Sequence, residues 1–261
     1  MNLKRNPTGL IFAMQEEQTG LAYYLSNKTT TRLANKDFLQ GDLWGHPVVC
    51  VLSGIGKVAA ASTTSILLQH FLAEKIVLTG VAGACDPQLR VGDIVIADQL
   101  VQHDMDASPL FPRFEIPLRG KTYFETDIKL REQLKTASQV FIKENLTSTI
   151  SNEDQTRFQL QQVAIHEGLI GSGDQFISSQ EKLNQLRQAL PTLLAVEMEG
   201  AAIAQVCHDF QHPFAILRTI SDGANDDAHL DFPAFIKTVA APYTVGILKN
   251  YFLGLKSSSC G

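Results

Sequence analysis

Short apolar runs recur along the chain, and each of them ends in glycine or in a polar turn. Runs of this length with little polar alternation are typical of strands that are buried on both faces. We therefore predict strands over Gly9–Met14, Pro47–Leu52, Lys75–Thr79, Asp93–Gln99, Ala164–Ile170 and Phe214–Ile220.

Longer segments between these runs carry apolar residues at helical spacing. They predict helices over Val58–Phe71, Leu183–Leu190, Gly200–Phe210 and Phe232–Leu255. Pro242 is a candidate break in the last of these helices, because proline removes a backbone donor. Strands that alternate with helices predict an α/β fold. Since α/β chains of 261 residues often form one continuous core, we predict a single domain over residues 1–261.

The stretch from Ala107 to Gln162 has a different character. It contains three prolines, Pro109, Pro112 and Pro117. Two polar segments follow them, Thr126–Lys143 and Thr147–Arg157. The first polar segment predicts a helix and the second a loop. We interpret the stretch as an elaboration of the domain, and we expect the tail at Ser257-Ser258-Ser259 to be mobile.

Composition excludes several classes of partner. With 44% hydrophobic residues and a net charge of -5, the chain can bury a core but lacks the basic excess that a nucleic acid requires. No apolar stretch reaches the roughly 18 residues of a membrane span, and Gly9–Met14 is too short for a signal peptide. The four cysteines form no C-x-x-C pair, which indicates reduced packing residues. We expect a cytoplasmic protein.

Acidic residues follow the predicted strands, at the edge where open α/β sheets bind ligands. Glu17 follows the first strand and Asp222 the last, and Glu197 and Glu199 interrupt a small or apolar run. An unpaired buried carboxylate costs several kcal/mol, so such groups are paired, protonated or used in a site. For Glu17 the alternative is a solvated carboxylate in the first turn of a helix.

Two strand ends are rich in glycine. Ser53-Gly54-Ile55-Gly56-Lys57 resembles a phosphate loop without its spacing, which favours a tight turn whose Ile55 lines an apolar pocket. Around Gly83 the side chains are so small that a flat ligand can approach the backbone. Phe176 follows a third glycine-rich loop, where it either stacks on a base or packs in the core.

Metal and acyl-transfer chemistry lack a pattern. His103-Asp104-x-Asp106 has no second cluster with ligand spacing, and His208, His212 and His229 stand apart. No G-x-S-x-G elbow is present. We predict neither a metal nor an organic cofactor.

An ordered set of motifs extends from Gly9 to about Leu248. It comprises Ala13-Met14-x-Glu16-Glu17, Ser53-Gly54-Ile55-Gly56-Lys57, Thr79-Gly80-x-Ala82-Gly83, Gly92-Asp93-Ile94-Val95, Ser172-Gly173-Asp174-x-Phe176-Ile177, Val196-Glu197-Met198-Glu199 and Ile220-Ser221-Asp222. The set resembles the 5′-methylthioadenosine/S-adenosylhomocysteine nucleosidase family. The resemblance implies an α/β/α sandwich around a mixed, partly barrel-like sheet, a homodimer, and hydrolysis of an N-glycosidic bond that releases adenine.

The resemblance also implies the roles of the site residues. Glu17 would deprotonate the water, Asp222 would protonate N7 of the adenine, and Glu199 would hold the ribose hydroxyls. The other implied contacts with the substrate are Gly83, Phe176 and the backbone of Ile177 at the base, Met198 at the ribose, Arg218 near the water, and Met14, Ile55 and Phe232 around the 5′-alkylthio group.

The chain departs from the family at Val81, where serine or threonine is usual, and at Ala107, where a larger apolar residue is common. Methylthioadenosine, S-adenosylhomocysteine, 5′-deoxyadenosine and aminodeoxyfutalosine all stay open as substrates. One alternative is a purine nucleoside phosphorylase, but the Gly-Asp-Pro-x-Arg-like motif of such enzymes is replaced by Met14-Gln15-Glu16-Glu17, whose carboxylates repel phosphate. Another is a non-catalytic protein that binds an adenosine derivative.

Overall fold

The computed structural model describes residues 6–223 and 232–257. The strands in these ranges are Thr8–Phe12 (β1), Ser26–Leu33 (β2), Lys36–Leu43 (β3), His46–Leu52 (β4), Lys75–Ala84 (β5), Ile94–Gln102 (β6), Tyr123–Glu125 (β7), Ile165–Ser172 (β8), Leu193–Glu197 (β9) and Phe214–Asp222 (β10). The α-helices are Gln15–Ala22 (α1), Lys57–Gln69 (α2), Ile128–Val140 (α3), Leu146–Thr149 (α4), Asn152–Arg157 (α5), Gln180–Ala189 (α6), Gly200–Asp209 (α7), Phe232–Phe235 (α8) and Ala241–Ser257 (α9). Two π-helical turns, Phe141–Asn145 (η1) and Ile236–Ala240 (η3), and a 3₁₀ turn, Leu160–Gln162 (η2), complete them.

The strands form one mixed sheet in the order β10-β6-β8-β9-β5-β1-β4-β3-β2, and β7 is added beside β6. Because β10 also pairs with β5, the strands β5, β10, β6, β8 and β9 close into a ring. The pairs of β5 with β1 and with β10 are parallel, whereas β5 with β9 and β6 with β10 are antiparallel. The carboxyl ends of β1, β5 and β10 therefore meet at one edge of the sheet.

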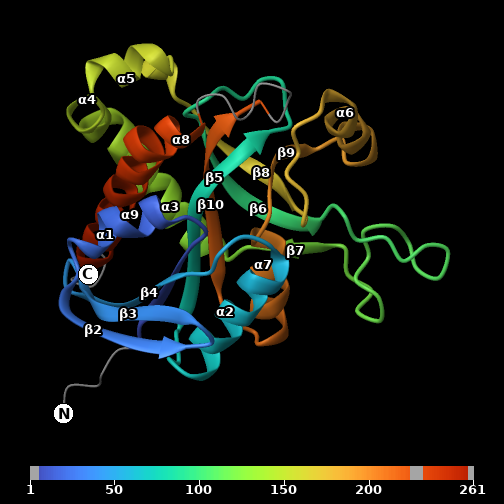
Figure 1. The fold of residues 1–261 in the computed structure, drawn as a ribbon, viewed down its shortest axis with the longest axis horizontal. Coiled ribbons are helices and arrows are strands. Elements are labelled where there is room, and N and C mark those ends of the chain that lie inside the picture. Colours follow the sequence, from blue (N-terminus) through green and yellow to red (C-terminus); the bar gives the residue numbers. More distant parts are fainter. Residues whose placement is uncertain (1–5, 224–231, 258–261) are drawn as a thin grey trace.

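Helices cover both faces of this sheet (Figure 1). Successive strand residues point to opposite faces, so Leu10 and Phe12 pack with α1, α3 and α9, while Ile11 packs with α2 and α7. All three side chains are fully buried. This arrangement confirms the predicted α/β/α sandwich with a mixed central sheet.

Each apolar run that predicted a strand overlaps one, namely β1, β4, β5, β6, β8 or β10, although Gly9–Met14 extends two residues beyond the end of β1. The hairpin of β2 and β3 was not predicted, because most side chains of β2 are polar and exposed. The short strands β7 and β9 were missed as well. β9 ends at Glu197, inside the run that Glu197 and Glu199 interrupt, and these acids break the apolar pattern that would predict a strand.

The structure corrects the predicted loop over Thr147–Arg157, where α4 ends and α5 forms. The Ser151 hydroxyl accepts a hydrogen bond from the Asp154 backbone at 3.1 Å and caps α5, a local bond that starts a helix in a polar sequence. Pro242 does not break the last helix. The π-helical turn η3 comes directly before α9, which carries Pro242 as its second residue and continues to Ser257.

No helix within residues 6–223 and 232–257 is long and apolar enough to cross a membrane. His229, Ser258, Ser259 and Cys260 lie outside the described residues, so the mobile tail stays a prediction. The single-domain organisation also stays a prediction.

Two glycines of α9 provide a matched test of this packing. A Cβ atom on Gly246 would overlap the ring of Phe141, which is fully buried, whereas a Cβ on Gly254 meets nothing within 4 Å. We expect Gly246→Ala to lower the free energy of unfolding by about 1–3 kcal/mol. Gly254→Ala should raise it by up to about 1 kcal/mol, because alanine favours the helix. Urea unfolding measures both, and equal stabilities would contradict the packing.

Candidate functional site

A cavity of about 160 Å³ lies at the sheet edge where β1, β5, β9 and β10 end. Every residue that the sequence predicted as catalytic or substrate-binding lines it: Met14, Glu17, Ile55, Gly83, Phe176, Ile177, Met198, Glu199, Arg218, Asp222 and Phe232. The lining residues that the sequence did not assign to the site are Ala13, Val81, Ala82, Gln175, Val196, Glu197 and Ser221. The fold thus assembles the predicted set in one place.

Glu17 is buried in this cavity. Helix α1 begins at Gln15, directly after β1, so Glu17 is its third residue and turns back toward the strand end. The Met14 backbone donates a hydrogen bond to Glu17 Oε2 at 3.3 Å, and Oε1 has no partner among the described residues. The alternative of a solvated carboxylate is therefore wrong for Glu17, whereas Glu16 beside it is exposed.

Burial raises the pKa of Glu17 from 4.5 to about 7, although the positive charge of Arg218 opposes the shift. The fold therefore favours the protonated carboxyl. The stabilisation that the protonated Glu17 gives to the folded state is fully present below the pKa of this group in the unfolded chain. It is lost as the pH rises through about 7. Near neutral pH this carboxylate is ready to accept a proton.

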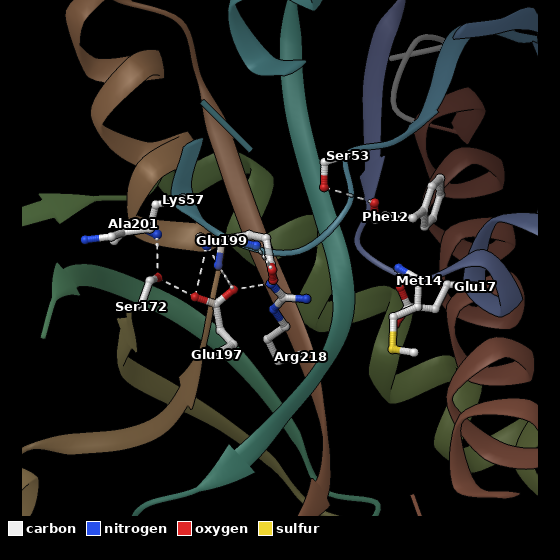
Figure 2. A network of polar contacts seen from close by, with 12 residues as sticks. Phe12, Met14, Glu17, Ser53, Lys57, Ser172, Glu197, Glu199, Ala201 and Arg218 are labelled. Atoms are coloured by element: carbon white, nitrogen blue, oxygen red, sulfur yellow. Dashed lines mark hydrogen bonds and ion pairs between the residues drawn. The ribbon is translucent and has the colours of Figure 1, made fainter. Parts of the chain in front are cut away.

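Arg218 connects the acids of the site. It lies on β10 with 1% of its surface exposed, and its Nη2 donates to Glu197 and, at 3.0 Å, to Glu199 Oε2 (Figure 2). Burial alone would lower the pKa of Arg218, but the charges of Glu197, Glu199 and Glu17 raise it. Its neighbour on β5 is Gly80, where any side chain would collide with the guanidinium. A glycine at this position is what lets a buried cation fit.

Glu199 stands at the N-cap position of α7 and is 4% exposed. Its Oε1 accepts a hydrogen bond from the Gly56 backbone at 2.9 Å, and its Oε2 accepts from Arg218. Burial raises the pKa of Glu199, whereas the charge of Arg218 lowers it. The carboxylate is thus held rigidly at the wall of the cavity.

Glu197 lines the cavity, and sequence reasoning left it without a role. Its carboxylate accepts from the Ser172 hydroxyl, from Arg218, and from the backbone of Gly200 at 2.9 Å. The same Ser172 oxygen accepts from the Ala201 backbone at 2.6 Å. The available signal was that Glu197 and Glu199 both interrupt an apolar run. Both acids line the cavity, but Glu197 supports Arg218 and the start of α7, whereas Glu199 is held by the Gly56 backbone and Arg218.

Asp222 ends β10, after an irregularity in the pairing with β5 that places it opposite Gly83. It is 8% exposed, and the Ser221 hydroxyl donates to its Oδ2 at 2.6 Å. The two acids Glu17 and Asp222 therefore come from different strand ends and line the same cavity.

Apolar side chains line the rest of the cavity. Phe176 and Phe232 meet edge to face, with ring centroids 6.4 Å apart. Ile55 and Phe176 are 62% and 49% exposed, so they mark the mouth of the cavity. The described residues contain no group of three or more His, Cys, Asp or Glu side chains arranged to hold a metal ion. The geometry combines a surface for a flat ring with carboxylates that stabilise positive charge.

Comparison with known proteins agrees with this site. The model of the phosphorylase superfamily matches residues 7–251. A 5′-methylthioadenosine/S-adenosylhomocysteine nucleosidase of Tolumonas auensis is 36% identical over 89% of this chain and 93% of its own length. One of Staphylococcus aureus is 38% identical over the same shares of the two chains.

Solved structures show the same architecture. The nucleosidase of Neisseria meningitidis in complex with methylthio-immucillin-A has a TM-score of 0.83 and 32% identity, over 96% of this chain and 100% of that one. The futalosine hydrolase of Helicobacter pylori has a TM-score of 0.81 and 31% identity, over 95% and 98%. This chain belongs to the phosphorylase superfamily and, within it, to the family of 5′-methylthioadenosine/S-adenosylhomocysteine nucleosidases.

Proposed function

We propose that this protein hydrolyses the N-glycosidic bond of 5′-methylthioadenosine, S-adenosylhomocysteine or both, and releases adenine and the 5′-thioribose. The observation that carries the proposal is the buried Glu17 carboxylate, whose Oε1 has no partner among the described residues of a cavity that also holds Arg218 and Asp222. The names of the relatives, at 36% and 38% identity, support the same reaction.

In the proposed mechanism, Glu17 accepts a proton from a water whose oxygen then bonds to C1′ of the ribose. The bond from C1′ to N9 of adenine breaks through an oxocarbenium-like state. Asp222 gives its proton to N7, so the departing base leaves neutral. Glu199 accepts hydrogen bonds from the ribose hydroxyls, and its negative charge stabilises the positive sugar. Arg218 orients Glu199 and lies near the water.

The cavity walls match the rest of such a substrate. In this proposal adenine stacks on Phe176 and bonds to the Ile177 backbone, and Gly83 allows close approach of the base. Met198 packs on the ribose. Met14, Ile55 and Phe232 line an apolar end that suits a soft thioether and disfavours a free phosphate.

Hydrolysis is favoured over phosphorolysis by the charges at the Glu17 end. The carboxylates of Glu17, Glu197 and Glu199 surround a single guanidinium, and that guanidinium already bonds to two of them. A phosphate anion would meet repulsion from the acids without a free cation among the lining residues of the cavity. A non-catalytic binding role is disfavoured as well, since Glu17, Glu199 and Asp222 all line the cavity.

We further propose a cytoplasmic homodimer. The resemblance to a dimeric family supports the homodimer, and the apolar side chains of Val58, Leu110 and Leu118, each more than four-fifths exposed, are available for contact with a second copy. The choice among the 5′-substituted adenosines stays open, because the structural relatives include a futalosine hydrolase besides the nucleosidases.

Adenine release tests the reaction. The purified protein is incubated with methylthioadenosine in phosphate-free buffer that contains a chelator, and phosphate is then added. We expect adenine and free methylthioribose before the addition, and an unchanged rate after it. Release that begins only with phosphate would establish a phosphorylase instead. No release from any of the candidate adenosines would support the binding protein.

The Glu17→Gln variant tests the proposed base. Turnover should fall about 10²- to 10⁴-fold, because the amide cannot accept the proton of the water. The dissociation constant for adenine, measured by calorimetry, should change little. Glu16→Gln is the matched control, since Glu16 lies in the same turn but is exposed. Near-normal turnover in Glu17→Gln, or a loss of binding as large as the loss of turnover, would contradict the role.

A further inference from the structure

Two loops that line the cavity lie against each other. The loop between β4 and α2 carries Ile55 and the Gly56 backbone that holds Glu199. The loop after β8 carries Phe176 and Ile177. The approach is close, because a Cβ atom on Gly56 would lie 3.0 Å from Oδ1 of Asp174. Whatever fixes one loop against the other also fixes the shape of the cavity.

Three residues outside the cavity wall connect these loops. The Lys57 ammonium lies 2.6 Å from Asp104 Oδ1, and the Lys57 backbone donates to Asp174 Oδ1 at 2.7 Å. The Asp174 backbone in turn donates to Asp104 Oδ2 at 2.9 Å. The three bonds join Lys57, Asp104 and Asp174 pairwise in a closed network, in which both carboxylate oxygens of Asp104 accept a hydrogen bond.

This network is anchored to the sheet and to α7. Lys57 Nζ also donates to Gln102 Oε1 at 3.0 Å, and Gln102 Nε2 donates to Gln205 Oε1 at 2.7 Å. Gln102 ends β6, and Gln205 lies on the helix that Glu199 begins. The bonds therefore link the start of α2, the end of β6 and the loop after β8 to α7.

Burial strengthens the ion pair between Lys57 and Asp104. The side chains of Lys57 and Asp104 are only 16% and 19% exposed, so water screens the pair weakly. Burial alone would raise the pKa of Asp104, but the hydrogen bonds from Lys57 and Asp174 and the Lys57 charge lower it. The Asp104 carboxyl therefore stays ionised near neutral pH. The ion pair also gives a structural role to Lys57, whose motif resembled a phosphate loop, and to Asp104, whose motif resembled part of a metal site.

We propose that Lys57, Asp104 and Asp174 are positioning residues that hold the base-binding loop against the loop that orients Glu199, and thereby set the affinity for the nucleoside. The inference rests on the proposed function of the cavity. In the proposed function, Phe176 and Ile177 contact the base both before and during bond cleavage. A displaced loop therefore weakens binding of substrate and transition state alike, which raises KM more than it lowers kcat.

We call the bonded set of Lys57, Asp104 and Asp174 the clamp. Two variants disrupt it without changing a residue that lines the cavity. Lys57→Met keeps an unbranched side chain one atom shorter and removes the charge. Asp104→Asn turns one accepting oxygen into a donor that faces another donor. Asp209→Asn is the control, because Asp209 also accepts from a basic side chain, Arg119 at 3.0 Å, but lies at the far end of α7. Lys57→Arg keeps the charge and tests for rescue.

In both clamp variants we expect KM for methylthioadenosine to rise about 10-fold and kcat to change less than about 3-fold. The dissociation constant for adenine, measured by calorimetry, should rise in parallel. Hydrogen exchange of a peptide that covers residues 173–178 should become faster. Lys57→Arg should recover part of the affinity, and Asp209→Asn should match the unmodified protein.

Unchanged KM, adenine affinity and exchange in the two clamp variants would overturn the proposal, and so would a loss confined to kcat. If Lys57→Met does not fold, Asp104→Asn alone decides, because it keeps the size of the side chain. A protein that binds adenine but cleaves no nucleoside would contradict the proposed function. The adenine affinity and the exchange rates of the variants would still decide whether the clamp exists.

Discussion

The buried guanidinium of Arg218 is the interaction on which the site depends. It bonds to Glu197 and Glu199 and carries the positive charge that Glu17 faces. Removing one partner of such a buried network typically costs about 3–5 kcal/mol, because a charge is left without compensation. β5, β9 and β10 must therefore stay in register for Arg218 to keep both carboxylates as partners. The closed ring of strands provides that register.

The chain brings its acids together by ending strands at one edge. Glu17 enters from the first turn of α1, Glu199 from the N-terminus of α7, and Asp222 from the last residue of β10. The cost is visible at Glu17, whose raised pKa means that ionisation at neutral pH reduces the stability of the fold. Stability given up at a site of this kind is expected where a group must exchange protons.

Much of this arrangement could be predicted from the sequence, because the strands that carry the site are apolar on both faces. Leu10, Ile11 and Phe12 show why: each face of β1 packs under its own layer of helices. The resemblance supplied the lining residues. By contrast, β2 could not be predicted, because most of its side chains are polar and exposed. Helix α5 could not be predicted either, because it depends on a single cap at Ser151.

Pairing between distant residues could not be read from the sequence. Glu197 and Glu199 are indistinguishable by spacing, and only the positions of Ser172 and Arg218 give the first a supporting role. Lys57 and Asp104 looked like parts of two separate motifs, yet they satisfy each other across 47 residues of chain. Such partners become known only when the fold sets their distance.

The pH dependence of kcat/KM tests the central claim that a buried Glu17 activates the water. This quantity reports the essential groups of the free enzyme. On the acid side the account predicts a fall of about tenfold per pH unit below an inflection near the Glu17 pKa of about 7, while circular dichroism shows that the protein stays folded. A profile that stays flat from about pH 5 to about pH 8 would contradict the account, because a base with this pKa must lose its activity when it is protonated.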